Sequence, residues 1–185
     1  MKNRLPPGQK LTETWPVLHY GSVPRVDQAG WTFKVVGELA DPRIITWEEF
    51  SALPRKKVIC DIHCVTTWSR YDNTFEGVST SVLANLAPPH AEAAYVMIRG
   101  EAGYTTNLPL KDFLSPDALF ATHHNGAPLS AEHGAPVRLV VPHLYFWKSA
   151  KWVTGMEYMR RDRAGFWEQN GYHMRGDPWS EERFD

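Results

Sequence analysis

The chain has 185 residues, of which 43% are hydrophobic and 22% are charged, and its formal net charge is −1. This composition is typical of one folded domain with a single core. Acidic and basic residues are interspersed, so the sequence predicts neither a nucleic-acid-binding surface nor any other strongly charged one. It contains no run of about 18 apolar residues, so no membrane-spanning helix is expected.

The first 25 residues contain four prolines and show no periodicity, which predicts an extended arm packed on the domain. This segment has no apolar signal-peptide core and no pair of adjacent arginines, so export is not expected. The sequence therefore predicts a cytoplasmic protein, whose two cysteines would be free thiols in that reducing compartment.

The middle of the chain carries short, alternating patterns of strands and helices. In chain order we predict a strand within residues 30–39, a helix over 46–53, a strand over 56–65, a helix over 79–87, a strand over 93–100 and one or two helical turns over 108–115. The first helix opens with a capping box formed by Thr46 and Glu49.

The second half of the chain begins with two turn signals, Asn125-Gly126 for a hairpin and residues 134–136 for a second turn. Strands are predicted over 136–142 and 148–159, with Gly155 as a bulge. The aromatic tail from residue 160 should pack without regular structure. Residues 1–185 are therefore predicted to form one mixed, strand-rich α+β domain with short helices.

Both cysteines lie in one stretch, "VICDIHCVTTWSRYDNTFEGV", residues 58–78. Cys60 falls inside an apolar run, where cysteine is usually a small buried hydrophobe. Cys64 falls where the predicted strand gives way to a polar loop, a place that a rigid scaffold holds and solvent reaches. We consider four roles for it, namely packing, zinc binding, nucleophilic catalysis and ligation of a redox metal carried by an organic cofactor.

The residue pattern supports the four roles of Cys64 to different degrees. A zinc site would use Cys60 and Cys64 with His63, His123 or His124, but structural zinc sites are built from two close ligand pairs. A thiol nucleophile needs an activating histidine, and a redox metal suits a soft thiolate. Spacing alone does not separate these last two roles.

Two motifs carry a resemblance to a known family. The segment "CDIHCVTTWSRYDNTFEGV" resembles the metal-binding segment of the sulfite oxidase family of molybdopterin-dependent oxidoreductases, especially its small bacterial members. "NGAPLSAEHGAPVRLVVPHLYFWKSAKWV" resembles the pterin phosphate-binding region of that family, and the tail is similar to the end of the small members. The resemblance covers about residues 15–185 and implies the sulfite oxidase molybdopterin-binding fold.

The resemblance implies a molybdenum-molybdopterin cofactor, no haem, and Cys64 as the molybdenum ligand in a two-electron oxygen-atom transfer. It also implies the residues that contact the pterin and its phosphate. These are His19, Tyr20, His63, Thr105 (with Thr106 close by), His133, Arg138, Ser149 and Lys151. A fixed cation suits a phosphate, arginine as a planar fork and lysine as a point charge.

Two further residues are catalytic candidates. Arg70, in the predicted loop after Cys64, could steady a thiolate or an anionic substrate, or could pair with Asp72. His123, like His63, could donate protons near neutral pH.

The sequence also departs from the family pattern. Leu18 stands where sulfite oxidases carry a sulfite-binding arginine, and Thr122 stands where they carry a catalytic tyrosine. These differences argue against sulfite oxidation and leave the small-molecule substrate open. With no fused haem domain, a separate electron-transfer protein is the expected partner, without nucleic acid or membrane. The alternatives are a non-catalytic molybdopterin-binding protein and a zinc- or thiol-dependent enzyme that uses Cys64.

Overall fold

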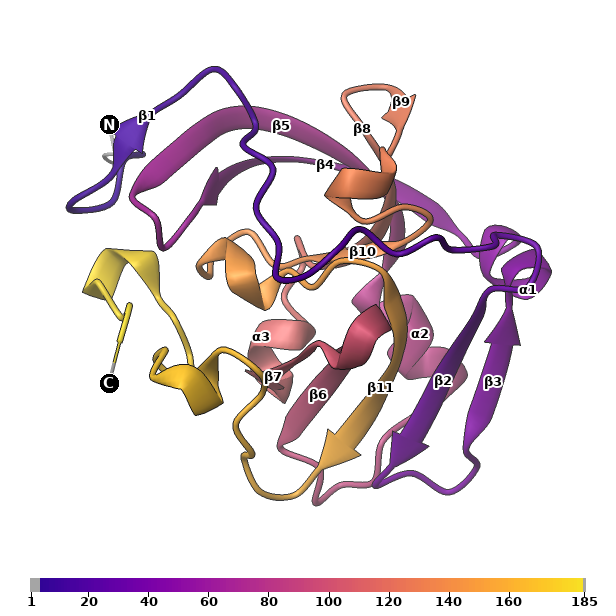
Figure 1. The fold of residues 1–185 in the computed structure, drawn as a ribbon. Helices are drawn as coiled ribbons and strands as arrows, with labels where there is room; N and C mark the ends of the chain where they lie inside the picture. The colour runs from indigo at the N-terminus through magenta and orange to yellow at the C-terminus, as the bar shows by residue number, and fades with distance from the viewer. Residues whose placement is uncertain (1–3, 185) are drawn as a thin grey trace.

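The computed structural model describes residues 4–184, whose strands form two sheets (Figure 1). Sheet A contains β1 (Lys10–Leu11), β5 (Trp68–Ser79), β8 (Leu119–His124) and β10 (Arg138–Val140) in that order, with β4 (Arg55–His63) paired to β5 and β9 (Ala127–Pro128) to β8. Sheet B has the order β3 (Arg43–Thr46), β2 (Thr32–Gly37), β11 (Val153–Met159), β6 (Tyr95–Gly100) and β7 (Thr105–Pro109). The predicted strand-rich α+β fold class is confirmed.

Helices in the described part of the chain are short, and none is long and apolar enough to cross a membrane. The α-helices are α1 (Trp47–Ser51), α2 (Thr80–Leu86) and α3 (Leu110–Phe113). Single 3-10 turns cover Glu101–Gly103, Ala131–His133, Phe146–Lys148, Glu168–Asn170 and Pro178–Ser180. The capping box is confirmed, because the Glu49 N–H donates to Thr46 Oγ1 and the Thr46 N–H donates to the Glu49 carboxylate.

The main core is built by side chains of both sheets. Phe33 of β2 and Ile98 of β6 belong to the same buried cluster as Phe120 of β8 and Leu139 of β10, and the Phe33 and Phe120 rings lie 5.0 Å apart. Burial of each such side chain stabilises the fold by about 1.5–3 kcal/mol. A second cluster on sheet A includes Phe75 and packs against Trp15, so this sheet carries apolar contacts besides those of the main core.

Local turn signals are also confirmed. Asn125 and Gly126 both have positive φ, 48° and 84°, as a two-residue hairpin of the primed type requires, and they connect β8 to β9. The register of β11 against β6 shifts between Val153 and Gly155, where a bulge was predicted. Between residues 161 and 184 the tail has only two 3-10 turns and one isolated bridge, and the N-terminal arm over residues 4–25 is irregular except for β1.

The structure differs from the predicted strands at three places. The polar loop expected after Cys64 is a turn of a few residues, and β5 then runs for 12 residues. Its buried face includes Ser69 and Asn73, so hydrophobic alternation is interrupted by polar side chains. β7 has no strand prediction because threonine, asparagine and proline dominate it. Residues 148–152 precede β11 in a 3-10 turn and a bend rather than extending the strand.

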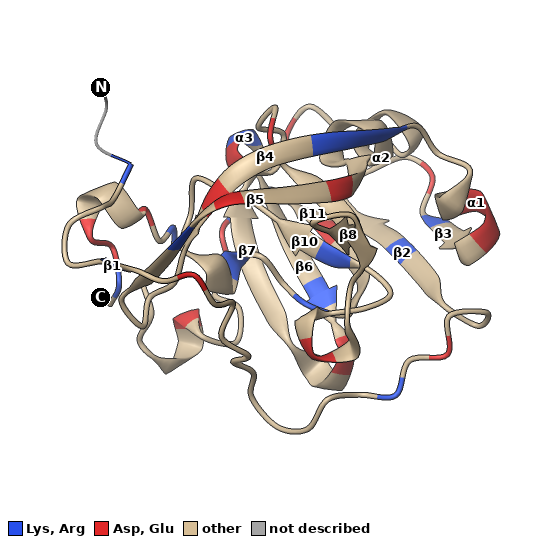
Figure 2. Ribbon diagram, turned by 90° about the horizontal axis from the view of Figure 1, so that it is seen from above, with Lys and Arg blue, Asp and Glu red and all other residues tan. Residues whose placement is uncertain are grey.

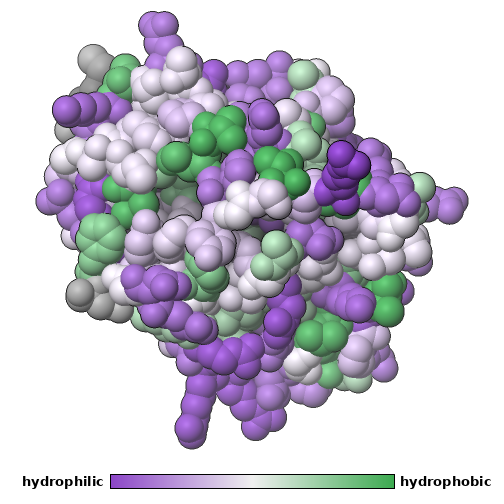
Figure 3. Space-filling model, in the orientation of Figure 1, coloured by the Kyte–Doolittle hydropathy of each residue, from purple (hydrophilic) through white to green (hydrophobic). Residues whose placement is uncertain are grey.

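Charges of both signs are spread over the elements (Figure 2), and the face seen in Figure 3 shows separate apolar patches among polar side chains. Many of these charges are paired, as in Arg99 with Glu157 and Arg160 with Glu38. Among these paired charges, a buried basic side chain without an acidic partner is an exception.

Candidate functional site

Arg138 on β10 is such a side chain, because it is 1% exposed. Its guanidinium donates to the carbonyls of His133 (3.0 Å) and Ser149 (2.8 Å) and lies 4.3 Å from the centre of the Phe146 ring. No ion pair with Arg138 occurs within residues 4–184, and burial lowers its pKa to about 9. A buried charge without a counter-charge is costly, so this position is suited to an anionic ligand.

Lys151 is a second cation without an acidic partner in the described chain. Its Nζ donates to the carbonyls of Leu18 (2.9 Å) and Glu132 (2.6 Å), and burial together with Arg138 lowers its pKa to about 7. Gly134 packs between the two cations, since a Cβ on it would lie 3.0 Å from Lys151 Cβ and 3.1 Å from Arg138 Cβ. The glycine therefore brings the two cationic side chains together.

Gly134→Ala is expected to lower the free energy of unfolding by about 1–3 kcal/mol, because Gly134 has φ +106° and no room for a Cβ. The matched control is Gly126→Ala, which has φ +84° and nothing within 4 Å of its Cβ. Urea unfolding of both variants checks this. Equal losses would mean that the contact with Arg138 and Lys151 adds nothing to the backbone cost.

The lowered pKa of Lys151 predicts a pH dependence of stability in the cofactor-free protein. Between pH 7 and the ordinary lysine pKa of about 10.4, the unfolded chain binds a proton that the folded chain lacks, so stability rises with pH. We expect the urea midpoint of the wild type to increase relative to that of Lys151→Met from about pH 7 to 8.5. The titration of unfolded cysteine also falls in this range, but it is common to both proteins and cancels in the comparison. Lys10→Met is the surface control. Parallel curves for wild type and Lys151→Met would contradict the prediction.

His133 lies beside this pair of cations and stacks on Trp15, with ring centroids 3.8 Å apart and planes 13° apart. Its Nδ1 is buried without a hydrogen-bonding partner, and burial followed by Arg138 lowers its pKa to about 4. A neutral ring with an unsatisfied nitrogen beside two cations is suited to a ligand with both negative charge and hydrogen-bonding groups. Trp15 was not predicted as a site residue, because nothing in the sequence beyond its aromatic character indicates this contact.

Ser149 holds Arg138 in place through its main chain and is 2% exposed. Its hydroxyl accepts from the Val141 N–H at 2.9 Å, which leaves the hydroxyl hydrogen free to donate. The structure thus brings together four of the predicted cofactor contacts, His133, Arg138, Ser149 and Lys151.

Cys64 lies directly after β4, at the start of a tight turn. The Cys64 N–H donates to the Trp68 carbonyl (2.8 Å), and the Thr67 N–H donates to the Cys64 carbonyl (3.0 Å). The Thr66 hydroxyl donates to Sγ at 3.1 Å. Burial raises the pKa of the thiol, while hydrogen bonds from Thr66 and the Val65 backbone, then the charge of Arg183, act in the other direction.

An aromatic wall surrounds this turn. Cys64 clusters with Tyr145 and Trp147, and the partly buried rings of Trp68, Trp167 and Tyr172 pack against them. Such a wall keeps water from one side of the sulfur and presents polarizable faces to whatever approaches it.

Arg70 lies on β5 rather than in a loop, as a consequence of the longer strand. It hydrogen-bonds to Asn73, to His124 Nε2 (3.3 Å) and to the Glu13 carbonyl (3.1 Å). The alternative pairing with Asp72 is not formed, since Asp72 pairs with Arg4. Arg70 therefore bonds to His124, and the His124 ring in turn packs on Trp15, with ring centroids 4.3 Å apart.

His124, and not the proton-donor candidate His123, lies against Arg70 and Trp15. Burial, then Arg70 and Arg138, lowers the pKa of His124 to about 4. His123 instead bonds to Arg55 (3.2 Å) and to the Thr122 hydroxyl (2.9 Å). The register of β5 against β8 shifts next to these histidines, so strand alternation could not show which ring faces Arg70.

His63 also has neighbours other than the two cations. It is 5% exposed, its Nδ1 is 2.8 Å from Ser69 Oγ, and its ring contacts Trp179. With Asp61 and His143 it lines a separate pocket of about 640 Å³. Burial lowers its pKa.

The remaining predicted contacts lie at the edge of the candidate site. His19 and Tyr20 are exposed on the arm, with Tyr20 against Phe166, and the neighbouring Leu18 carbonyl accepts from Lys151. The Thr105 carbonyl accepts from the Phe166 N–H at 2.8 Å. The arm and the tail thus meet beside Lys151.

A buried ion pair that the sequence did not reveal ties the tail to the body. Lys148 Nζ lies 2.7 Å from Glu168 Oε1, and both side chains are fully buried. Glu168 also accepts from Trp147 Nε1 (2.8 Å) and from the Thr106 hydroxyl (3.1 Å). Lys148 directly precedes Ser149 in the chain, so this ion pair anchors the segment that contains Ser149 and Lys151.

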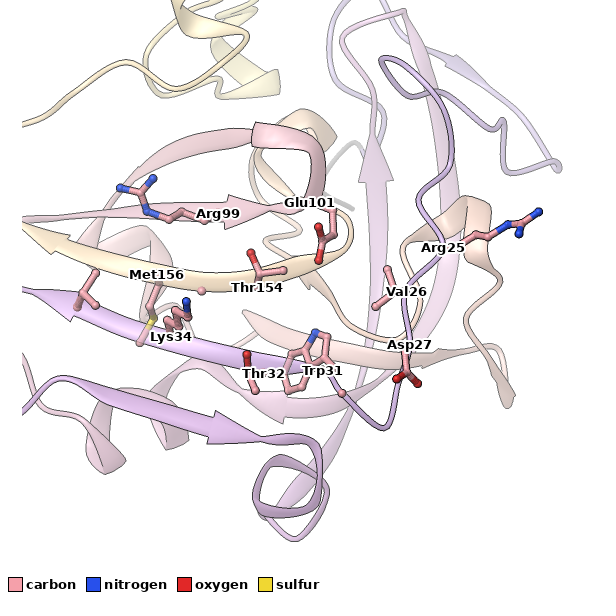
Figure 4. Close-up of a pocket in the computed structure, with 13 residues that line it drawn as sticks. Arg25, Val26, Asp27, Trp31, Thr32, Lys34, Arg99, Glu101, Thr154 and Met156 are labelled. Atoms are coloured by element: carbon pink, nitrogen blue, oxygen red, sulfur yellow. The ribbon is translucent and has the colours of Figure 1, made fainter.

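A groove of about 740 Å³ lies on sheet B, where side chains of β2, β6 and β11 such as Lys34, Arg99 and Thr154 line it (Figure 4). No predicted site residue lines it. The zinc alternative finds little support either, because among residues 4–184 no three His, Cys, Asp or Glu side chains form a group that could hold a metal ion.

Comparison with known proteins agrees with this picture. The model of a family described as the oxidoreductase molybdopterin binding domain matches residues 20–167. The chain is 50% identical over 182 residues to the uncharacterized oxidoreductase YuiH of Bacillus subtilis (strain 168), covering 98% of this chain and 92% of YuiH. It is 27% identical over 173 residues to the putative protein-methionine-sulfoxide reductase subunit YedZ1 of Azospira oryzae, covering 92% of this chain and 66% of that protein.

Among solved structures, the sulfane dehydrogenase SoxCD of Paracoccus pantotrophus has a similar fold, with a TM-score of 0.73 and 20% identity. The match covers 83% of this chain and 43% of that chain. The chain therefore spans about two thirds of YedZ1 and less than half of the matched SoxCD chain.

Proposed function

The chain belongs to the molybdopterin-binding oxidoreductases of the sulfite oxidase family, and from this premise we propose that it is a molybdenum-dependent enzyme with Cys64 as the thiolate ligand. The observation that supports this most strongly is Arg138, a buried cation without an acidic partner in the described chain, next to Lys151. The unsatisfied Nδ1 of His133 adds a hydrogen-bonding position. This set fits an anionic pterin with a terminal phosphate.

The protein residues have distinct proposed roles. Arg138 and Lys151 hold the phosphate, with the Ser149 hydroxyl as a further donor, and His133 contacts the pterin. Cys64 presents its sulfur to the metal, with the Thr66 hydroxyl hydrogen-bonded to it. The bound cofactor supplies two-electron oxygen-atom transfer, and the protein supplies orientation, charge and exclusion of water.

We propose a small, largely neutral sulfur or sulfoxide compound as substrate. The aromatic wall beside Cys64 suits such a molecule, because sulfur makes favourable contacts with aromatic rings. The name of YedZ1, a putative protein-methionine-sulfoxide reductase subunit, points to the same class. Electrons would come from or go to a separate protein, since the relatives include one named as a subunit.

The test of this function is metal and pterin analysis of the protein expressed in a host that makes molybdopterin. We expect near-stoichiometric molybdenum and pterin, and turnover of a small sulfoxide with an artificial electron donor. Zinc, or no metal at all, would overturn the proposal and favour a thiol enzyme. Bound cofactor without any oxygen-atom transfer across a substrate panel would instead indicate a non-catalytic molybdopterin-binding protein.

A smaller experiment separates the two neighbouring histidines. If His123 supplies protons, His123→Gln changes the pH–rate profile, as expected when a general acid is removed. His124→Gln should instead lower the cofactor content, because His124 packs on Trp15 and bonds to Arg70. An unchanged profile in His123→Gln would remove that residue from the mechanism.

A further inference from the structure

The main chain of the Cys64 turn is held by a side chain of the N-terminal arm. Gln9 is 7% exposed, and its Nε2 donates to the Cys64 carbonyl at 3.1 Å. Its Oε1 accepts from the Ser69 hydroxyl at 3.2 Å, so both ends of the amide are used. The main chain of the arm also bonds to the turn, since the Lys10 N–H donates to the Thr67 carbonyl at 2.8 Å.

The C-terminal tail holds the same turn from another direction. Arg183 NH1 donates to the Val65 carbonyl at 2.8 Å, and NH2 donates to the Pro7 carbonyl at 3.3 Å. The guanidinium also lies 5.1 Å from the ring centre of Tyr145, a member of the Cys64 cluster. No ion pair of Arg183 occurs in the chain between residues 4 and 184, so its observed hydrogen bonds go to the turn and the arm.

We infer that Gln9 and Arg183 are positioning residues for Cys64, and that the two ends of the chain together set the direction in which its sulfur points. The inference rests on the proposed function of Cys64 as a metal ligand. Side-chain direction follows main-chain geometry, and the carbonyls of Cys64 and Val65, two successive residues, are each held by one of these side chains. Removal of groups that orient a metal ligand typically costs about 10–100-fold in metal affinity or activity.

A positioning role and a purely structural role for Gln9 and Arg183 predict different results at the Cys64 sulfur. If Gln9 and Arg183 only attached the chain ends, their loss would lower stability and leave the sulfur environment unchanged. If they position Cys64, their loss changes the accessibility of the thiol in the cofactor-free protein and the thiolate-to-metal absorption in the loaded protein. These two measurements therefore carry the test.

The experiment uses the full chain with Cys60→Ser, so that Cys64 is the only thiol. The variants are Gln9→Leu and Arg183→Met, which keep side-chain size, and the control is Lys10→Gln, an exposed neighbour on the arm. In cofactor-free protein we expect the rate constant of the Cys64 thiolate with iodoacetamide, taken from the pH dependence of the reaction, to be up to about tenfold higher in both variants, as for the loss of a hydrogen bond that restrains local opening. Comparing thiolate rate constants removes the effect of the Arg183 charge on the pKa of the thiol. The control should react like the wild type.

In loaded protein the same variants should show a shifted thiolate-to-molybdenum absorption band and a kcat about 10–100-fold lower. Arg183→Lys keeps the charge and one donor, so it should recover part of the loss and serves if Gln9→Leu fails to fold. Unchanged alkylation together with an unchanged band would overturn the inference. Absence of molybdenum from the wild type would overturn the proposed function instead, while the alkylation rates would still decide whether the chain ends position Cys64.

Discussion

Cys64→Ser is expected to lower turnover by more than about 100-fold, since removal of groups that only orient a metal ligand already costs about 10–100-fold. The pterin content should remain close to that of the wild type, because Arg138, Lys151 and His133 are untouched. The fold should also remain, because the thiol lies at a turn and its hydrogen bond from Thr66 can pass to the serine hydroxyl. Turnover, pterin fluorescence after oxidation and thermal unfolding measure the three quantities.

Cys60→Ser is the matched control. Cys60 lies four residues earlier, on β4, and burial, with Asp61 next, raises its pKa to about 12, so it remains a neutral thiol. We expect this variant to keep its molybdenum and most of its turnover. Full activity in Cys64→Ser, or equal losses in the two variants, would contradict the assignment of Cys64 as the metal ligand.

Arg138→Met is expected to reduce cofactor affinity by about 2–5 kcal/mol, the cost of removing one partner of a buried charge pair. Each 1.4 kcal/mol is a factor of ten, so the purified variant should contain little molybdopterin. Arg138→Lys should recover only part of the affinity, because an ammonium lacks the planar fork that donates to the carbonyls of His133 and Ser149. Pterin released per mole of protein is the measurement.

Arg160→Met is the control for a lost arginine, since Arg160 is a surface residue paired with Glu38. Its pterin content should equal that of the wild type, because an exposed ion pair contributes little. If Arg138→Met retained a full complement of cofactor, the buried cation would have to serve the fold alone, and the phosphate would have to bind elsewhere.

Elements with local signals could be predicted from the sequence. The capping box of Thr46 and Glu49, the Asn125-Gly126 turn and the apolar run of β4 each depend on neighbouring residues, and each occurs as predicted. β5 could not be recognised, because its buried positions include Ser69 and Asn73, which serve the site rather than the core. A strand that lines a polar site loses the apolar alternation by which strands are recognised.

The residues of the site also divide into those that the sequence groups and those that only the tertiary structure brings together. Arg138, Ser149 and Lys151 lie close together in sequence, and the family resemblance sufficed to group them. Trp15 and Gln9 reach the site from the arm and Arg183 from the tail, so only the tertiary structure shows their contacts. His124 and His123 are neighbours in sequence, and a register shift beside them decides their different partners.

The position of β11 has a consequence for how the protein is made. This strand lies between β2 and β6 in sheet B, yet it is synthesised late, after most of the chain. Arg183, which completes the Cys64 turn, is synthesised later still. Although domains generally fold from the N-terminus during synthesis, sheet B cannot close until β11 has emerged from the ribosome. Cofactor insertion is therefore expected to wait until β11 and Arg183 have emerged from the ribosome.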